Sequence, residues 1–119
     1  MPRTLTIHLR TGTMMNMDTN VAVKLAKAAI EKGHKVNIFG YGEGITIIKE
    51  GQDPKRFPNV GKLVQELSAQ GATVAVCETC CAARGIQRGE EMKGTKIGSL
   101  VNDFSRFTAE SDKMITIAR

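Results

Sequence analysis

Short apolar runs alternate with segments of helical spacing along this 119-residue chain. The short runs are rich in Val, Ile and Thr, which favour the pleated conformation of a strand. They predict strands at residues 4–9, 35–40, 72–77 and 113–118, with a brief extended segment at 95–98 as a candidate fifth strand. Residues 45–48 are also apolar, but they fit either a short strand or one helical turn.

Four segments between these strands have the apolar spacing of helices. The first follows the capping candidates Asp18, Thr19 and Asn20 and runs to Lys32. The second begins at Asn59, and a short third covers residues 79–84. Their apolar positions are Val21, Leu25, Ala28 and Ala29 in the first helix, Leu63, Val64 and Leu67 in the second, and Leu100, Val101, Phe104 and Phe107 in the last.

This alternation of strands and helices is typical of a parallel sheet covered on both faces. We therefore predict an α/β fold, a three-layer α/β/α sandwich with a mostly parallel sheet of four to five strands. Residues 1–119 are expected to form one domain, because a chain of this size builds one core and contains no linker or internal repeat.

Composition narrows the class of protein. No apolar run approaches the ~20 residues of a membrane helix, and the first residues are too polar for a signal peptide, so we expect a cytoplasmic protein. Seventeen Lys and Arg against twelve Asp and Glu give a net charge of +5, but the basic residues are dispersed. Together with an aromatic content of 4%, this argues against nucleic-acid binding. An acidic protein partner fits the charge equally well.

The three cysteines, Cys77, Cys80 and Cys81, lie within five residues. Their odd number and tight spacing do not suit a disulfide framework, and they indicate reactive, redox or metal-binding thiols instead. Cys77 directly follows a predicted strand, and open α/β sheets react at the carboxyl ends of their strands. If Cys77 is instead a small buried residue, it is purely structural.

A helix beginning just after Cys77 would turn its unpaired N–H groups toward the sulfur and favour a thiolate, which is the nucleophilic form. Glu78 opposes this effect, and either Arg84 or Arg88 could compensate by folding back. Cys81 lies about 100° further round the helix than Cys80 and is expected to face the sheet.

Cys77 and Cys80 form a C-x-x-C motif, a spacing that permits a disulfide or two ligands to one metal. A thioredoxin-like protein carries this motif earlier in the chain and opens a longer helix with it. Structural zinc needs four ligands, and only His8 and His34 could add to the thiols. Both histidines are expected to be structural, so we predict no metal site and no cofactor.

Two further features lie near predicted strand ends. The glycine run Gly40-x-Gly42-x-Gly44 lacks the spacing of a dinucleotide-binding loop and predicts a tight turn. A methionine cluster follows the first strand, and it could line an apolar pocket, form an interface or pack on the core. Its members are Met14, Met15 and Met17.

Four segments carry a family resemblance over nearly the whole chain. They are Phe39-Gly40-x-Gly42-x-Gly44-Ile45, Val76-Cys77-x-x-Cys80-x-x-x-Arg84-Gly85-Ile86, Ile97-Gly98-Ser99-Leu100-Val101 and Ser111-Asp112-Lys113-Met114-Ile115-Thr116. With them, the sequence resembles the DsrE/DsrF-like sulfur-relay family, which includes the TusD-type proteins.

The resemblance implies a small cytoplasmic α/β protein that assembles as a homotrimer or homohexamer. Sulfur-carrying members hold sulfur as a persulfide on one cysteine and pass it to the cysteine of another protein, without a metal or cofactor. Cys77 matches that position. Cys80 departs from the best-known carriers, and it introduces a second thiol that could form a disulfide or act as a resolving thiol.

Three functions stay open. The first is a sulfur carrier or sulfurtransferase that holds a persulfide on Cys77, with sulfur donor and acceptor proteins as partners. The second is a dithiol redox or redox-sensing protein that uses Cys77 and Cys80, and the third is a non-catalytic oligomeric subunit. Apolar residues expected in loops suit an oligomer interface. They are Tyr41, Ile45, Ile47, Ile48 and the Met14–Met17 group.

Overall fold

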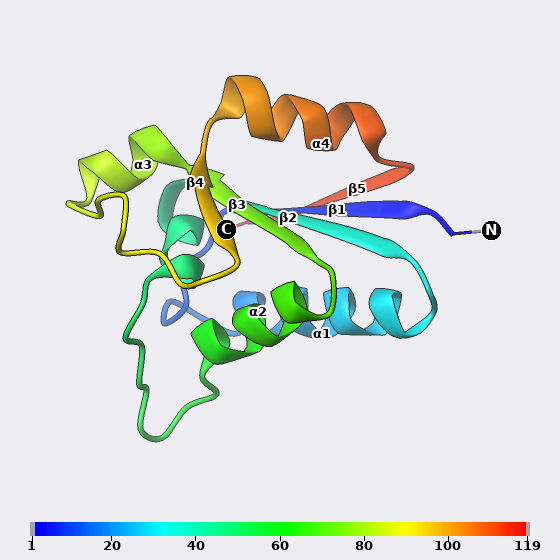
Figure 1. Ribbon diagram of the computed structural model, residues 1–119. Helices are drawn as coiled ribbons and strands as arrows, with labels where there is room; N and C mark the ends of the chain where they lie inside the picture. The colour runs from blue at the N-terminus through cyan, green and yellow to red at the C-terminus, as the bar shows by residue number, and fades with distance from the viewer. Residues whose placement is uncertain (1, 119) are drawn as a thin grey trace.

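Five parallel strands form the central sheet of the computed structural model, which describes residues 2–118 (Figure 1). Their order across the sheet is β4-β3-β2-β1-β5. The strands are β1 (Thr4–Leu9), β2 (Lys35–Gly40), β3 (Thr73–Cys77), β4 (Thr95–Gly98) and β5 (Lys113–Ile117). The predicted strands and the predicted α/β sandwich are therefore confirmed, and the short segment at 95–98 is a strand of the sheet.

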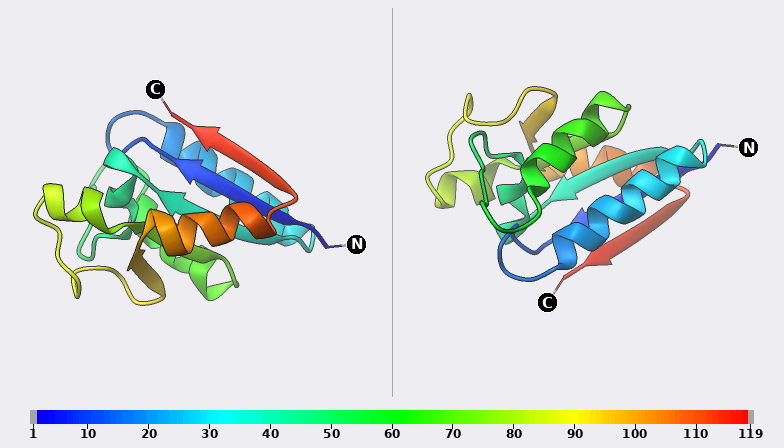
Figure 2. Two further views of the ribbon diagram at one scale, coloured as in Figure 1. Left: turned by 90° about the horizontal axis from the view of Figure 1, so that it is seen from above. Right: turned by 90° about the horizontal axis from the view of Figure 1, so that it is seen from below.

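Helices cover both faces of this sheet (Figures 1 and 2). On one face lie α1 (Asp18–Glu31) and α2 (Val60–Ala69). On the other lies α4 (Ser105–Glu110), which continues from a π-helical turn, η2 (Leu100–Phe104). A short helix, α3 (Glu78–Ala83), follows β3 directly, and a 3₁₀ helix, η1 (Gly42–Ile48), follows β2. None of the helices within residues 2–118 is long and apolar enough to cross a membrane.

The central strands are buried on both faces, as parallel strands between helical layers must be. Phe39 in β2 packs against Phe104 and Phe107, with ring centroids 5.1 Å and 6.3 Å away. The neighbouring Ile38 is also buried, as is Val74 in β3. Residues 74–76 are all apolar, without the alternation of apolar and polar side chains seen in a half-exposed strand, because both faces of β3 are covered.

The buried face of α1 follows the prediction only in part. Leu25 and Ala29 pack against the core as expected, but Val21 is 54% exposed, and the buried apolar residues are Ala22, Val23 and Ala26. The helix is therefore oriented with Ala22, Val23 and Ala26 on its inner side and Val21 on its outer side. The helix also begins earlier than expected, because the Asn16 Oδ1 accepts the amide N–H of Asp18 at 2.8 Å.

The capping of α2 follows the prediction, since Asn59 Oδ1 accepts the amide N–H of Lys62 at 3.0 Å. The ambiguous apolar segment before it is the helix η1. Ile45, Ile47 and Ile48 are buried there in the protein's own core. The expectation that these isoleucines serve an oligomer interface is wrong, because the 3₁₀ turn folds them back against the sheet and α2.

Candidate functional site

Cys77 is the last residue of β3 and lies at the carboxyl edge of the sheet, as the sequence predicts. It pairs in register with Gly98 of β4, and α3 begins at the next residue, Glu78. Gly85, with φ of +75°, follows the end of α3. The three cysteines are therefore carried on one strand end and one short helix.

A pocket of about 290 Å³ opens at this edge. Its lining comes from the end of β3, the start of α3, the residue after β2 and the segment after β4. The lining residues are Tyr41, Cys77, Glu78, Thr79, Cys80, Ser99, Leu100 and Val101. Two of the three thiols thus border one cavity large enough to admit a side chain of an approaching molecule.

Cys77 caps α3 with its sulfur. Its Sγ accepts the amide N–H of Cys80 at 3.4 Å, in the position where a serine or aspartate oxygen usually caps a helix. The side chain is only 3% exposed. The predicted N–H donor toward this sulfur is present, and it comes from Cys80 itself.

Cys80 has a different environment, although it lies one turn away. Its Sγ accepts the amide N–H of Gly42 at 3.3 Å, and the residue is 9% exposed. Burial raises the pKa of the Cys80 thiol, while the hydrogen bond from Gly42 and the charge of Arg84 act in the opposite direction. The neighbouring Cys77 thiol raises it further. The charge state of Cys80 therefore depends on that of Cys77.

Cys81 faces the core, as predicted, and is almost fully buried. Burial, followed by the neighbouring Cys77 and Cys80, raises the pKa of the Cys81 thiol to about 11. At neutral pH such a thiol carries almost no thiolate. Cys81 is accordingly a packing residue beside the pocket rather than one of its lining groups.

Both candidate arginines fold back toward the site. Arg88 pairs with Glu78 and donates to the carbonyl oxygen of Ile97 at 2.6 Å, so it neutralises the charge beside Cys77 and ties α3 to β4. Arg84 pairs with Glu43 of η1, with its Nη2 and Nε 2.7 Å and 2.9 Å from the Glu43 Oε1. The Arg84 Nη1 also donates to the Cys80 carbonyl oxygen at 2.9 Å.

The segment after β4 forms an apolar rim on the pocket. Its turn is held by Asp103, whose Oδ2 accepts the amide N–H of Ser99 at 2.8 Å and whose Oδ1 accepts from Lys96 Nζ at 2.8 Å. The rim residues Leu100 and Val101 are exposed, Val101 to 79%. The sequence indicated an apolar helix face at these positions, but the π-helical turn directs both residues away from the core.

The histidines lie apart from the thiols. His8 of β1 packs against Phe104 at 4.8 Å between ring centroids, and burial, assisted by the charge of Arg10, lowers the pKa of His8. The His34 Nδ1 accepts the amide N–H of Arg3 at 3.1 Å. Across residues 2–118, no three His, Cys, Asp or Glu side chains gather in a way that could hold a metal ion.

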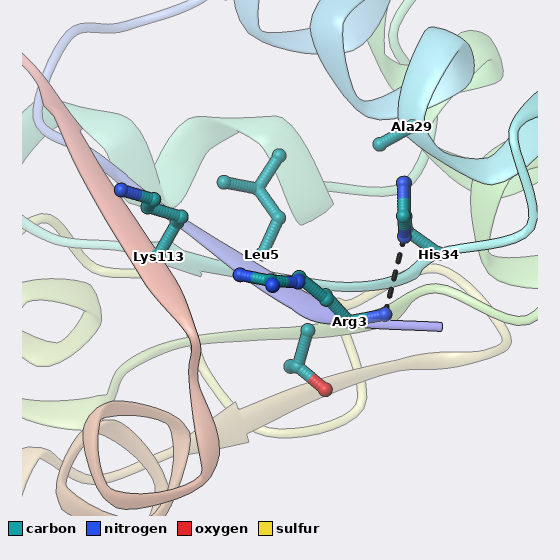
Figure 3. Close-up of a pocket in the computed structure, with 6 residues that line it drawn as sticks. Arg3, Leu5, Ala29, His34 and Lys113 are labelled. Atoms are coloured by element: carbon teal, nitrogen blue, oxygen red, sulfur yellow. Dashed lines mark hydrogen bonds between the residues drawn. The ribbon is translucent and has the colours of Figure 1, made fainter. Parts of the chain in front are cut away.

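Two further pockets within residues 2–118 have no thiol among their lining residues. One of about 160 Å³, drawn in Figure 3, lies at the opposite edge of the sheet, where β1 and β5 begin. Its lining includes Leu5, His34 and Lys113. Another is lined in part by Met14, Met17 and Phe57, whose side chains are exposed. The methionine cluster therefore does not contribute to the cysteine pocket.

Several known proteins are similar to this chain in sequence and in fold. The family model described as DsrE/DsrF-like matches residues 6–117. An uncharacterized protein of Methanocaldococcus jannaschii is 35% identical over 95 residues, which cover 80% of this chain and 82% of that protein. Protein YchN of Escherichia coli is 30% identical over 86 residues, covering 72% of this chain and 73% of YchN.

Solved structures agree with the sequence matches. The crystal structure of the E. coli YchN protein superposes with a TM-score of 0.89 at 26% identity, covering 98% of this chain and 100% of YchN. A protein of unknown function from Methanobacterium thermoautotrophicum shares the fold, with a TM-score of 0.76 at 15% identity over 97% of this chain and 99% of that one. The match over residues 6–117 and the identity to YchN together establish that this chain belongs to the DsrE/DsrF-like family.

Proposed function

We propose that the protein is a cytoplasmic sulfur carrier that holds a persulfide on Cys77 and passes the outer sulfur to a cysteine of a partner protein. The observation that carries the proposal is the position of Cys77 at the end of β3. There it borders a 290 Å³ pocket and accepts an N–H hydrogen bond on its sulfur. Membership of a family associated with sulfur relay supports the same chemistry.

The proposed relay consists of two displacements at sulfur. In the first, the Cys77 thiolate attacks the outer sulfur of a donor persulfide, the donor S–S bond breaks, and the donor leaves as a thiolate. In the second, the thiolate of an acceptor cysteine attacks the outer sulfur now held on Cys77. The Cys77–sulfur bond breaks, and Cys77 is regenerated as a thiolate. No electrons enter or leave the pair of proteins, so the relay requires no cofactor.

The residues around Cys77 have separate tasks in this scheme. The Cys80 amide donates to the Cys77 sulfur and would stabilise negative charge there when Cys77 attacks or leaves. Arg88 neutralises Glu78, which would otherwise repel an approaching thiolate. The exposed Leu100 and Val101 offer an apolar rim on which the donor and acceptor proteins would pack.

A homotrimer or homohexamer is the proposed assembly. After the correction for the buried isoleucines, the exposed apolar side chains available to an interface include Met14, Met15, Met17, Met114 and Ile115. Met114 and Ile115 lie on β5, an edge strand whose outer side has no partner strand within residues 2–118. Light scattering should give a mass of three or six chains, and a monomer at micromolar concentration would contradict the assembly.

A dithiol redox or redox-sensing function is the second candidate. It is favoured by the position of both thiols on one pocket, where the Cys77 sulfur accepts the Cys80 amide at 3.4 Å, since a disulfide requires the two sulfurs to meet. Replacing Cys80 separates the two functions. A carrier would still take up sulfur on Cys77, whereas a redox protein would lose its reversible disulfide.

Intact-mass spectrometry after incubation with a low-molecular-weight persulfide tests the proposal. The Cys80→Ser protein should gain one sulfur atom that dithiothreitol removes, and adding Cys77→Ser should abolish the gain. Cys81→Ala, which alters a buried thiol on the core side, is the matched control and should still take up sulfur. Sulfur uptake that survives the loss of Cys77 would refute the carrier.

A further inference from the structure

Two sulfurs share the first turn of α3. The Cys77 Sγ accepts the Cys80 amide at 3.4 Å, and burial and the Cys77 thiol both raise the pKa of the Cys80 thiol. Both residues line the same pocket, whereas Cys81 is directed into the core. A sulfur atom added to Cys77 would therefore lie beside the thiol of Cys80, inside the same cavity.

Burial raises the pKa of the Cys80 thiol on balance, but two neighbouring groups oppose burial and favour the anionic form. The Gly42 amide donates to its sulfur from η1 at 3.3 Å, and Gly42 has φ of +61°, a conformation that turns this loop at little cost only for glycine. Arg84 is held beside Cys80 by Glu43 and by the Cys80 carbonyl oxygen. A purely structural cysteine in a helix needs neither an N–H donor on its sulfur nor an anchored guanidinium.

We infer that Cys80 is a resolving thiol, which discharges the Cys77 persulfide as hydrosulfide when no acceptor protein occupies the pocket. This inference rests on the proposed function. The Cys80 thiolate attacks the inner sulfur, the one bonded to Cβ of Cys77, and a Cys77–Cys80 disulfide forms. The bond between the inner and outer sulfurs breaks, and the outer sulfur leaves as HS⁻. The Cys80 thiolate supplies the electron pair, so its sulfur is oxidised to the disulfide level and the outer sulfur is reduced to sulfide.

The disulfide must be reduced before Cys77 can load again. A low-molecular-weight thiol supplies the two electrons, since two such thiols convert the disulfide into two cysteine thiols and become a disulfide themselves. An acceptor protein that packs on the rim reaches the outer sulfur and competes with Cys80. The protein would then transfer sulfur when an acceptor is present and release sulfide when it is absent.

A single-turnover experiment tests this inference. Reduced protein is loaded with a low-molecular-weight persulfide and desalted, and released hydrosulfide and intact mass are followed over time. Wild type should release up to one hydrosulfide per loaded chain and end with a mass two hydrogens below that of the reduced chain. Peptide mapping should then identify a disulfide between Cys77 and Cys80. Cys80→Ser and Cys80→Ala should both load and release sulfide at least about tenfold more slowly.

Each outcome has one meaning. Loading of the Cys80 variants reports an intact Cys77 site, so a slower release cannot be attributed to misfolding. Release from Cys80→Ser at the wild-type rate, or a disulfide to Cys81, would overturn the resolving role and leave the carrier standing. If no variant takes up sulfur, the proposed function fails, and the resolving role fails with it. Cys81→Ala is the matched control and should release sulfide as wild type does.

Discussion

The backbone amide of Gly42 donates a hydrogen bond to the Cys80 sulfur at 3.3 Å, across 38 positions of the sequence. This contact joins η1, which follows β2, to α3, which follows β3. It is reinforced one residue later by the ion pair between Glu43 and Arg84. The second thiol is thereby held in the lining of the pocket that Cys77 also borders.

The thiols should react with iodoacetamide in the order Cys77, Cys80, Cys81 at neutral pH. The pKa values of Cys80 and Cys81 are both raised, mainly by burial, and that of Cys81 reaches about 11. Because a raised pKa leaves less thiolate at a given pH, these two thiols should label slowly at neutral pH and faster as the pH rises. Peptide mapping after brief, limiting alkylation measures the order.

Exposure acts against this order, since Cys80 is 9% exposed and Cys77 only 3%. The experiment therefore decides whether the thiolate fraction or the solvent exposure of each cysteine controls its reaction rate. If Cys80 labels first, Cys80 is the nucleophile, and Cys77 takes the resolving or structural role.

Replacing Arg84 by alanine should slow the alkylation of Cys80 by no more than about threefold at a given pH, because the charge of Arg84 lowers the pKa of that thiol. The groups that face Cys80 are the thiols of Cys77 and Cys81, the Gly42 amide, and Arg84 with its partner Glu43. The curve of alkylation rate against pH should move to higher pH.

Lys49→Ala is the control for this experiment, since it removes another partly exposed ion pair, with Glu90, away from the cysteines. An unchanged pH profile in the Arg84 variant would show that the ion pair with Glu43 is only structural.

Much of this architecture could be read from local pattern. The apolar run at 74–76 is long enough for a strand and too short for a helix, and the strand end places Cys77 at the reactive edge. The inner face of α1 could not be read in the same way, because two apolar stripes compete on it. Val21 lies on the exposed side of the helix, and Ala22, Val23 and Ala26 lie on the buried side.

The parts of the site that could not be predicted from the sequence depend on contacts between residues far apart in the chain. Gly42 and Glu43 approach Cys80 and Arg84 only after the strands have paired, and no local pattern reports such a meeting. The glycine run carries the one available signal, since it predicts a tight turn at the same sheet edge. The exposure of Val101 could not be predicted for a different reason. A helix face that packs on the core and an apolar rim that faces solvent have the same apolar spacing in the sequence.

Gly98→Ala should destabilise the protein by about 1–3 kcal/mol, as overpacking usually does. A Cβ at this position would collide with the carboxylate of Asp103, which is buried. Gly12→Ala is a matched control, because a Cβ there meets no atom closer than 3.4 Å and should cost much less. Urea unfolding measures both, and equal costs would contradict the close packing of Asp103 on β4.

Asp103→Asn should cost about 1–3 kcal/mol at neutral pH, the range for hydrogen bonds to a charged group. Burial alone would raise the pKa of Asp103, but hydrogen bonds from Lys96 and from the Ser99 amide outweigh it, and the pKa is lowered. Because the folded pKa lies below the unfolded value, the stabilisation is fully present above the unfolded value and is lost as pH falls through the folded pKa.

Urea unfolding of wild type and Asp103→Asn at about pH 7 and about pH 3 should therefore show the difference between them shrinking in acid. A difference that stays constant between the two pH values would mean that the Asp103 charge contributes nothing to stability.

The location of the added sulfur tests the central claim most directly. Cys80→Ser and Cys77→Ser proteins are loaded with a low-molecular-weight persulfide, alkylated at once, and analysed by peptide mapping with tandem mass spectrometry. The account predicts one extra sulfur on Cys77 in the Cys80 variant and none on any cysteine in the Cys77 variant. An extra sulfur on Cys80 or Cys81 when Cys77 is absent would contradict it.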